Sequence, residues 1–460
     1  MKNKRITNAA TALLILINVG LFALIWLSFY NSFAFRTHRS EGALGAIAVY
    51  YIIYRWLSKL YRGYAFASTG VDEIVLSQFI SFGIADLILY VASVLLRRNY
   101  VPVWPGAVTV LLQLLMTALV AGLAKRYLMR HIQPDRTLLI YGGRENEESA
   151  RRFIGRLEEK YAHLFDVSRV LPDDADEART TAAIDASDKV IFFGCAPEAR
   201  ARYIEYCMDS GRGFFFVPEF TDIVCAGCTV KNFLDTPLLR YDTTGARPAS
   251  GVLKRLLDIV LSLLFLAILW PFMLITAVCI LIEDGRPVIF RQERVTMDNR
   301  HFRIMKFRSM VKNAEDYGPL PATENDPRIT KVGRVIRACR FDELPQLVNI
   351  LLGHMSFVGP RPECIAHVDL YSEEVPEFKF RTAVKAGLTG YAQVYGKYNT
   401  SPEDKLKLDM LYIENQSLLL DFKLFLLTIK IIFRRESTEG FDQQRSRQIN
   451  RQSGGSASRE

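Results

Sequence analysis

Residues 254–282 read KRLLDIVLSLLFLAILWPFMLITAVCILI. The uncharged part, Ile259 to Ile282, is long enough to cross a bilayer as a helix. Pro271 lies at its centre, where a proline removes a helix hydrogen bond and kinks or breaks the chain. Basic residues flank both ends, namely Lys254, Arg255, Arg286, Arg291 and Arg294. We therefore expect a helix-break-helix over 254–282 that enters the membrane and returns; the alternative is an ordinary span kinked at Pro271.

Apolar runs also dominate the first 130 residues. They cover Ala9–Phe29, Gly42–Tyr54, Ile74–Leu96 and Tyr100–Leu123, of which the second is weaker. Each predicts a membrane-spanning helix, and the first is too long for a cleaved leader. The flanks on one side are richer in basic residues: Lys2, Lys4, Arg5, Arg55, Lys59, Arg62, Lys125, Arg126 and Arg130, against Arg36, Arg39, Arg97 and Arg98. Residues 1–130 are thus predicted to form a four-span helical bundle with both ends in the cytoplasm.

A single acidic residue, Asp86, interrupts the third apolar run. Charged residues inside a membrane often mark functional sites. A pairing or snorkelling contact near the interface is the simpler interpretation, and we favour it.

Residues 131–248 are predicted to form a Rossmann-like cytosolic domain. Buried strands at 137–141, 189–193 and 214–217 alternate with helical stretches, which is typical of a parallel α/β sheet. Gly142 and Gly143 follow the first strand, but no third glycine completes a dinucleotide motif. We therefore favour a sensory or structural domain over an NAD site. Cys225 and Cys228 form a C-x-x-C pair for which zinc or redox roles are less probable than chance burial.

Overall composition limits the class of protein. The chain has 460 residues, is 50% hydrophobic and 23% charged, and carries a formal net charge of +9. These values exclude a disordered protein and allow nucleic acid, anionic lipid or phosphorylated substrates as partners. Seven cysteines, an odd number, fit a reducing compartment better than a secreted disulfide framework.

An arginine-rich region, residues 286–361, contains the acidic pair Asp342 and Glu343. Clustered arginines with few aromatic partners suit phosphate groups better than nucleic acid. Asp342 and Glu343 precede a helix whose apolar face is predicted at Leu344, Leu347, Val348, Leu351 and Leu352. The two carboxylates either cap this helix or, as ionised groups among arginines, bind a divalent metal or attack phosphorus. The loop 359–362, with two prolines, would hold Arg361 in one place.

Five stretches then carry a resemblance. They are Phe290–Arg294, Lys306–Met310, Asp342–Leu347, Ser356–Glu363, and Gly387–Gly390 with Ala392–Val394. On these stretches, residues 252–434 resemble the bacterial sugar transferase family, the monotopic polyprenol-phosphate phosphoglycosyl transferases. The whole chain looks like its long subgroup, typified by undecaprenyl-phosphate galactose or glucose phosphotransferases. Two departures are Ala386, where the family commonly has proline, and Trp270, where a small residue is usual.

This resemblance implies an activity and a site. The family transfers hexose-1-phosphate from a UDP-sugar to undecaprenyl phosphate with release of UMP, the first membrane step of exopolysaccharide, capsule or O-antigen assembly. By likeness, Asp342 is the nucleophile that forms an aspartyl-phosphosugar intermediate, and Glu343 acts as base or positions groups. Mg²⁺ would be held in part by Asp342. The substrate's phosphates would be bound by Arg337, Arg361, Lys306, Arg308 and Asp409.

The remaining expectations concern domains, partners and alternatives. The catalytic domain is predicted at 249–435, with Leu418–Phe433 lying on the membrane or the core and a disordered tail at 436–460. We expect a multi-pass protein of the bacterial inner membrane with both soluble domains in the cytoplasm, in contact with the lipid bilayer and without nucleic acid; a homodimer is compatible with this architecture. A nucleotide-sugar dehydratase or epimerase is disfavoured because no tyrosine has a lysine four residues later. A non-catalytic regulator is disfavoured by the intact acidic pair and Arg361.

Overall fold

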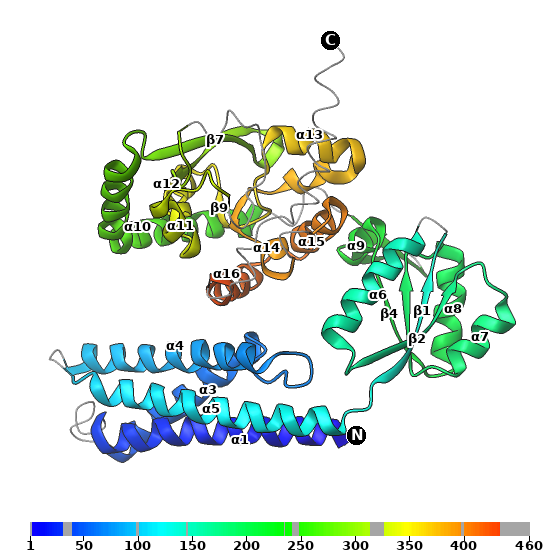
Figure 1. Cartoon of the computed structure of the whole chain (residues 1–460), viewed down its shortest axis with the longest axis horizontal. Helices are drawn as coiled ribbons and strands as arrows, with labels where there is room; N and C mark the ends of the chain where they lie inside the picture. Colours follow the sequence, from blue (N-terminus) through cyan, green and yellow to red (C-terminus); the bar gives the residue numbers. More distant parts are fainter. Residues whose placement is uncertain are drawn as a thin grey trace, which may run out of the picture. The chain divides into compact units, whose positions relative to one another are not determined.

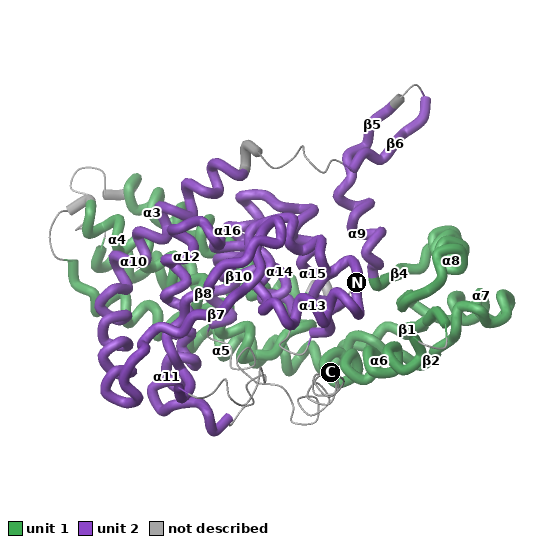
Figure 2. Tube along the Cα trace, turned by 90° about the horizontal axis from the view of Figure 1, so that it is seen from above, with its two compact units in different colours: residues 1–217 green, residues 218–460 purple. Residues whose placement is uncertain are grey.

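The computed structural model describes residues 2–30, 39–97, 101–143, 146–233, 235–241, 248–312, 326–396 and 400–432. The chain forms two compact units, Met1–Val217 (unit 1) and Pro218–Glu460 (unit 2), coloured separately in Figure 2. The tail predicted at 436–460 lies outside the described residues.

Unit 1 begins with a bundle of four long helices that lie side by side in Figure 1. They are α1 (Lys2–Ile25), which continues as the π-helical turn Trp26–Tyr30, α3 (Arg39–Leu60), α4 (Val71–Arg97) and α5 (Trp104–His131). Three of these are long and apolar enough to cross a membrane, over Ile6–Tyr30, Val71–Leu95 and Trp104–His131. The weaker second predicted span does form a helix, α3, but it does not reach the same threshold. Among the described residues, one further helix is long and apolar enough to cross a membrane, namely α10 of unit 2.

Hydrogen bonds between polar side chains tie the four helices together inside the bundle. Asn18 Nδ2 of α1 donates to Tyr54 Oη of α3 (3.1 Å) and to Thr117 Oγ1 of α5 (3.3 Å). Tyr54 Oη in turn donates to Gln78 Oε1 of α4 (2.7 Å). In a lipid environment such side chains have no water to bond to, so each cross-helix pair favours one packing arrangement. Asp86 lies in α4, and its buried Oδ2 has no hydrogen-bond partner among the described residues, so the predicted pairing is not found there.

The second part of unit 1 is a parallel α/β sheet, as predicted. Its strands are β1 (Asp135–Tyr141), β2 (Phe165–Pro172), β3 (Lys189–Phe193) and β4 (Gly213–Phe216), in the order β2-β1-β3-β4. Helices α6 (Glu147–Tyr161), α7 (Glu177–Asp185) and α8 (Pro197–Asp209) connect them. Leu138, Leu139 and Ile140 of the central strand β1 are fully buried, because a parallel strand is covered on both faces.

Unit 2 is mainly helical with three small two-stranded sheets. After α9 (Phe220–Ala226) come the antiparallel pair β5 (Thr229–Phe233) and β6 (Thr236–Arg240), α10 (Pro248–Asp284), and the antiparallel pair β7 (Ile289–Val295) and β8 (His301–Phe307). Then follow α11 (Lys331–Ala338), α12 (Gln346–Leu352), β9 (Ser356–Val358), α13 (Ile365–Glu374), β10 (Gly387–Thr389), α14 (Tyr391–Tyr395), α15 (Pro402–Glu414) and α16 (Leu418–Ile432). Strands β9 and β10 pair in parallel.

Helix α9 and strands β5 and β6 fall in unit 2. Ile223 of α9 is buried in the same hydrophobic cluster as Met410 and Ile413 of α15. Residues 218–241 therefore lie in unit 2, and the domain boundary predicted at residue 248 stays a prediction.

The apolar segment 254–282 forms one helix and not two. Helix α10 is continuous over 37 residues with Pro271 inside it, so the predicted break is absent. The ribbon changes direction along its length instead, as Figure 1 shows. A proline leaves one carbonyl of the preceding turn without its donor, which bends a helix more often than it ends one when both halves are packed. The re-entrant course itself stays a prediction.

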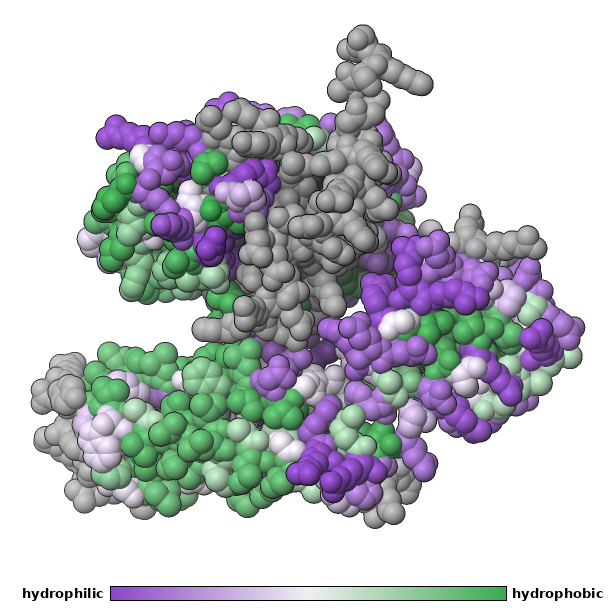
Figure 3. Space-filling view, viewed as in Figure 1, coloured by the Kyte–Doolittle hydropathy of each residue, from purple (hydrophilic) through white to green (hydrophobic). Residues whose placement is uncertain are grey.

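Both halves of α10 pack against the body of unit 2. Leu261 and Phe265 of the first half join the main hydrophobic cluster, and Met273 and Ile280 of the second half contact Phe307 and Ile336 in another. The opposite face is exposed and apolar, and includes Leu256, Val260, Leu264, Trp270, Ile275, Val278 and Ile282. Figure 3 shows apolar side chains gathered over this part of unit 2 and over the bundle of unit 1.

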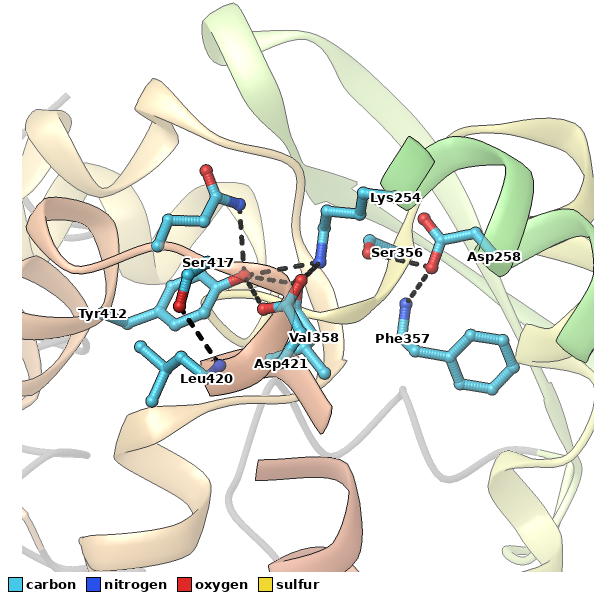
Figure 4. A network of polar contacts seen from close by, with 10 residues as sticks. Lys254, Asp258, Ser356, Phe357, Val358, Tyr412, Ser417, Leu420 and Asp421 are labelled. Atoms are coloured by element: carbon cyan, nitrogen blue, oxygen red, sulfur yellow. Dashed lines mark hydrogen bonds and ion pairs between the residues drawn. The ribbon is translucent and has the colours of Figure 1, made fainter. Parts of the chain in front are cut away.

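A buried polar network holds the start of α10 to the rest of unit 2 (Figure 4). Lys254 Nζ donates to Asp421 Oδ2 of α16 (2.5 Å) and to the carbonyl of Val358 in β9 (2.9 Å). Tyr412 Oη of α15 donates to Asp421 Oδ1 (2.8 Å). One turn along α10, the Asp258 carboxylate accepts from the Phe357 backbone N–H (3.1 Å). The membrane-type helix is therefore joined to the strand that precedes the Arg361 loop.

Breaking this network should destabilise unit 2. The Lys254 and Asp421 side chains are only 16% and 12% exposed, so Asp421→Asn leaves a buried ammonium without its counter-charge, at a cost of about 3–5 kcal/mol. Asp188→Asn is the matched control, because Asp188 pairs with Arg136 at 42% and 62% exposure and such pairs contribute about 0–1 kcal/mol. Thermal unfolding of the detergent-solubilised protein measures both. Equal shifts for the two variants would contradict the anchoring role.

Candidate active site

The two predicted catalytic carboxylates lie just before α12 and not on its first turn. Asp342 and Glu343 occupy the 3₁₀ turn Phe341–Glu343, which follows Arg340 in the left-handed conformation (φ 60°). Pro345 then forms the N-cap of α12. The helix buries Leu347 and Ile350 as its inner face, whereas the predicted face residue Leu352 is 60% exposed. The acidic pair thus lies in a tight turn, and the buried helix that follows fixes the position of this turn.

Helix α12 is fastened to strand β8 by one asparagine. Asn349 Oδ1 accepts from the Met305 backbone N–H, and Asn349 Nδ2 donates to the Arg303 carbonyl, both at 2.9 Å. These bonds extend the edge of β8 onto the helix. They set the distance between the turn that carries the carboxylates and Lys306 on β8.

Glu343 is held between two cations. Its Oε1 lies 3.2 Å from Lys306 Nζ and 3.0 Å from Arg361 Nη2. The Glu343 and Lys306 side chains are mostly buried. Burial raises the pKa of Glu343, but Lys306, Arg361 and Arg340 outweigh that effect and hold the pKa far below its ordinary range. Glu343 is therefore an ionised group that organises Lys306 and Arg361, and it is a weak base at neutral pH.

Asp342 differs from its neighbour in both partners and charge. Within the described residues it makes no hydrogen bond and no ion pair. Burial and the adjacent Glu343 raise the pKa of Asp342, while Lys306, Arg337 and Arg340 oppose the rise. Adjacent carboxylates whose environments move their pKa values apart are suited to different roles. Asp342 is the one free to meet a ligand.

The loop that carries Arg361 passes very close to a second loop. Strands β9 and β10 lie in parallel, and a Cβ on Gly387 would come within 2.1 Å of the Gly359 nitrogen. Only glycine lets the two backbones meet at this distance. This close crossing of the two backbones fixes the course of the chain between strand β9 and Arg361.

Two residues predicted to bind phosphate make contacts within the protein. Arg308, 6% exposed, donates through Nη2 to the carbonyls of Asp284 (3.0 Å) and Gly285 (2.8 Å), at the end of α10. Asp409 is fully buried and accepts from Arg381 Nη2 (2.7 Å). Of the predicted phosphate-binding set, the structure brings Lys306 and Arg361 onto Glu343, and the charge of Arg337 acts on Asp342.

Sequence reasoning missed two arginines beside the site. Arg294 donates through Nη2 to Gln292 Oε1 (2.6 Å) and through Nη1 to the Pro362 carbonyl (3.3 Å). Arg381 donates to the Arg361 carbonyl (2.8 Å). Arg294 stood in one of the five family-like stretches, so that match was a usable signal. Arg381 stood outside all of them.

The site can be tested for its fit to Mg²⁺. Among the described residues no group of three or more His, Cys, Asp or Glu could hold a metal by itself. Magnesium, however, is commonly bound by one or two carboxylates together with substrate phosphates and water. Asp342, with no other partner among the described residues, fits that pattern. Mg²⁺ stays a prediction.

The glycine turn of the α/β domain is a poor nucleotide site. In a sheet of order β2-β1-β3-β4, the ligand crevice lies between the ends of β1 and β3. There a Cβ on Gly142 would lie 2.1 Å from the Gly194 carbonyl oxygen, so the two loops already touch. Asn146 Nδ2 donates to the Gly142 carbonyl (2.7 Å) across this point. The contact and the Asn146 side chain both lie at the point where a pyrophosphate would bind, and residues 144–145 of this loop lie outside the described residues.

The C-x-x-C pair is only partly as expected. Both thiols are free, but Cys225 is exposed and Cys228 is half-buried, so chance burial does not describe them.

The two adjacent carboxylates should have opposite effects on stability at pH 7. Asp342→Asn removes a charge whose pKa is raised on folding, so the unfolding midpoint should stay or rise. Glu343→Gln removes a charge whose pKa is lowered and leaves Lys306 and Arg361 facing each other, at a cost of about 1–3 kcal/mol. Thermal unfolding at pH 7 compares them. A larger loss for Asp342→Asn would contradict this assignment.

The similarity to known proteins lies in the part of the chain that contains this site. Residues 249–435 match the family model described as bacterial sugar transferase. The chain is 44% identical over 188 residues to the UDP-N-acetylgalactosamine-undecaprenyl-phosphate N-acetylgalactosaminephosphotransferase of Aeromonas hydrophila, covering 40% of this chain and 44% of that protein. It is 41% identical over 197 residues to the UDP-glucose:undecaprenyl-phosphate glucose-1-phosphate transferase of Escherichia coli (strain K12), covering 41% and 42%.

A shorter relative is matched almost throughout. The exopolysaccharide production protein PSS of Rhizobium leguminosarum bv. phaseoli is 40% identical over 189 residues, covering 39% of this chain and 94% of that protein. The match thus spans under half of the first two relatives and nearly all of the third. On this evidence the chain belongs to the bacterial sugar transferase family.

Proposed function

We propose that this protein transfers hexose-1-phosphate from a UDP-sugar to undecaprenyl phosphate and releases UMP. The observation that carries the proposal is Asp342, a carboxylate without a partner among the described residues, next to Lys306, Arg361 and Arg337. Two of the relatives named above are undecaprenyl-phosphate sugar phosphotransferases, which supports the reaction class.

The reaction would proceed by two displacements at one phosphorus. A carboxylate oxygen of Asp342 attacks the phosphorus that bears the sugar, the bond from that phosphorus to the bridging oxygen breaks, and UMP leaves with the bridging oxygen. A phosphate oxygen of undecaprenyl phosphate then attacks the same phosphorus and the bond to Asp342 breaks. Lys306 and Arg361 face the negative charge that builds on the phosphoryl oxygens. Mg²⁺, held in part by Asp342, would add further positive charge at the diphosphate.

Glu343 acts in this scheme by position. Its lowered pKa makes it a poor proton acceptor, whereas its contacts hold Lys306 and Arg361 at a fixed spacing. Of the two roles left open by the sequence, the positioning role is the one we propose.

Helix α10 is proposed to enter and leave the same face of the membrane. A helix that crossed would place its two ends on opposite sides. Here Lys254 near the start contacts Asp421, and Asp284 at the end pairs with Arg308 (3.0 Å), so both ends are fastened to unit 2. With the exposed apolar face of α10 in lipid, the site would lie at the membrane surface, near the lipid phosphate. We propose that this is the cytoplasmic face of the bacterial inner membrane.

The two alternatives have less support. A dehydratase or epimerase would need a nucleotide in the α/β domain, where the crevice is closed by Gly142, Gly194 and Asn146. A non-catalytic regulator would have no need of an unpaired, partly buried Asp342.

Substitution of the nucleophile should abolish turnover and covalent capture. Asp342→Asn should release UMP at least about 1,000-fold more slowly from whichever UDP-sugar the wild type accepts, since removing a covalent nucleophile costs this much or more. Acid-quenched wild type should carry label from a UDP-sugar radiolabelled in the sugar, and the variant should not. Asp369→Asn, an exposed carboxylate of α13, is the control and should behave as wild type. Wild-type turnover by Asp342→Asn would refute the mechanism, and no UMP from any UDP-sugar would refute the activity.

Acidification should reveal the environment of Asp342. Its pKa is raised, so the ionised nucleophile is lost as pH falls through a value above the ordinary aspartate range of about 4. Glu343→Gln removes the neighbouring negative charge and leaves Lys306 and Arg361 to act on Asp342. The acidic limb of kcat/KM for the residual activity should therefore move to lower pH. A limb that stays in place or moves upward would contradict the electrostatic coupling of the pair.

A further inference from the structure

The segment 361–363 is held at three successive carbonyls. Arg381 Nη2 donates to the Arg361 carbonyl (2.8 Å), Arg294 Nη1 to the Pro362 carbonyl (3.3 Å), and the Val295 backbone N–H to the Glu363 carbonyl (3.2 Å). A peptide whose carbonyl is held cannot rotate without breaking that bond. The direction in which the Arg361 side chain leaves the backbone is therefore set by these donors, and Arg381 is the one attached to Arg361 itself.

Arg381 is itself fixed inside the protein. It lies in the 3₁₀ segment Pro376–Ala383 and is 5% exposed. Its Nη2 and Nε lie 2.7 Å and 3.1 Å from Asp409 Oδ2, and its Nη1 lies 3.7 Å from Glu363 Oε1. Glu363 also binds Lys405 (2.6 Å). The Arg381 guanidinium thus contacts Asp409 and Glu363, and one of its N–H groups donates to the Arg361 carbonyl.

Asp409 has no other hydrogen-bonding task among the described residues. It is fully buried, both of its hydrogen bonds come from Arg381, and its Oδ1 has no partner within the described part of the chain. Burying such a pair costs desolvation energy that apolar side chains of similar size would avoid. Stability alone therefore gives little reason for this pair.

We propose that Arg381 is a positioning residue for the transfer reaction: it holds the Arg361 carbonyl so that the Arg361 guanidinium faces Glu343 and the transferred phosphoryl group, and Asp409 holds Arg381 in place. The proposal rests on the proposed function. It gives Asp409 a role through Arg381 and not through direct contact with phosphate.

The substitution Arg381→Lys keeps the positive charge of residue 381 but changes the geometry of its hydrogen bonds. An ammonium keeps the positive charge opposite Asp409, but it lacks the planar fork that reaches Asp409 and the Arg361 carbonyl together. The Arg361 side chain would then lose its fixed direction. Misplacement of a binding group by about 1 Å can reduce the rate about 100-fold, so Arg381→Lys should lower kcat/KM by about 10- to 100-fold.

The test is a double-mutant cycle between Arg381→Lys and Arg361→Ala in the full-length protein. Steady-state UMP release is measured with a UDP-sugar accepted by the wild type. If Arg381 acts through Arg361, then Arg381→Lys should add less than about 3-fold to the loss already caused by Arg361→Ala, because the two act on one interaction. Losses that multiply would overturn the positioning role.

Control variants separate this outcome from misfolding. Arg328→Lys alters another buried pair of unit 2, with Asp326 at 2.6 Å, and should keep kcat/KM within about 2-fold of wild type. If Arg381→Lys fails to fold, Asp409→Asn takes its place in the cycle, with non-additivity expected again and multiplied losses overturning the proposal. An inactive wild type would refute the proposed function, whereas an active wild type with multiplied losses would refute only the role of Arg381.

Discussion

The active site depends on one carboxylate between two cations. Glu343 contacts Lys306 from strand β8 and Arg361 from the loop after β9, so three separate segments meet at a single oxygen. Without that negative charge, Lys306 and Arg361 would repel each other in a poorly solvated place. With it, both cations stand ready before any phosphate arrives. This pre-organisation is what an electrostatic catalyst requires, since groups already in place need not rearrange as charge develops.

The same constraint explains the contrast between neighbours in sequence. The tight turn Phe341–Glu343 directs one carboxylate into the cation pair and leaves the next one without a partner among the described residues. Asp342 consequently sits in an environment that disfavours its charge, while Glu343 sits in one that favours it. The nucleophilic role that we propose for Asp342 is compatible with this environment, because a carboxylate fully satisfied by arginines would have little tendency to form a new bond. In this proposal Asp342 supplies the reactive oxygen, and Glu343 holds the two cations in place.

Much of this could be predicted from sequence where the signal is local. The acidic pair, Lys306 and Arg361 each stand in a distinctive stretch, and the parallel sheet follows from alternating strands and helices. Partners brought together by folding were beyond reach: Asp409 pairs with Arg381, and Ile223 packs against Met410, and no periodicity reveals either. Pro271 shows a different limit. A proline removes one hydrogen bond, but the packing of both halves of α10 on unit 2 decides whether the helix ends or bends.

Helix α10 has one more consequence for how such an enzyme meets its substrates. With α10 in the bilayer, as we propose, the protein would move with the membrane and would encounter a lipid substrate by lateral diffusion in two dimensions and a nucleotide substrate by diffusion from the bulk. For the lipid, the relevant quantity is the mole fraction in the membrane and not the amount per volume of sample. Adding inert phospholipid at constant total lipid carrier would therefore slow the reaction by surface dilution. Anchoring in the membrane would thus determine which concentration scale governs each half of the proposed reaction.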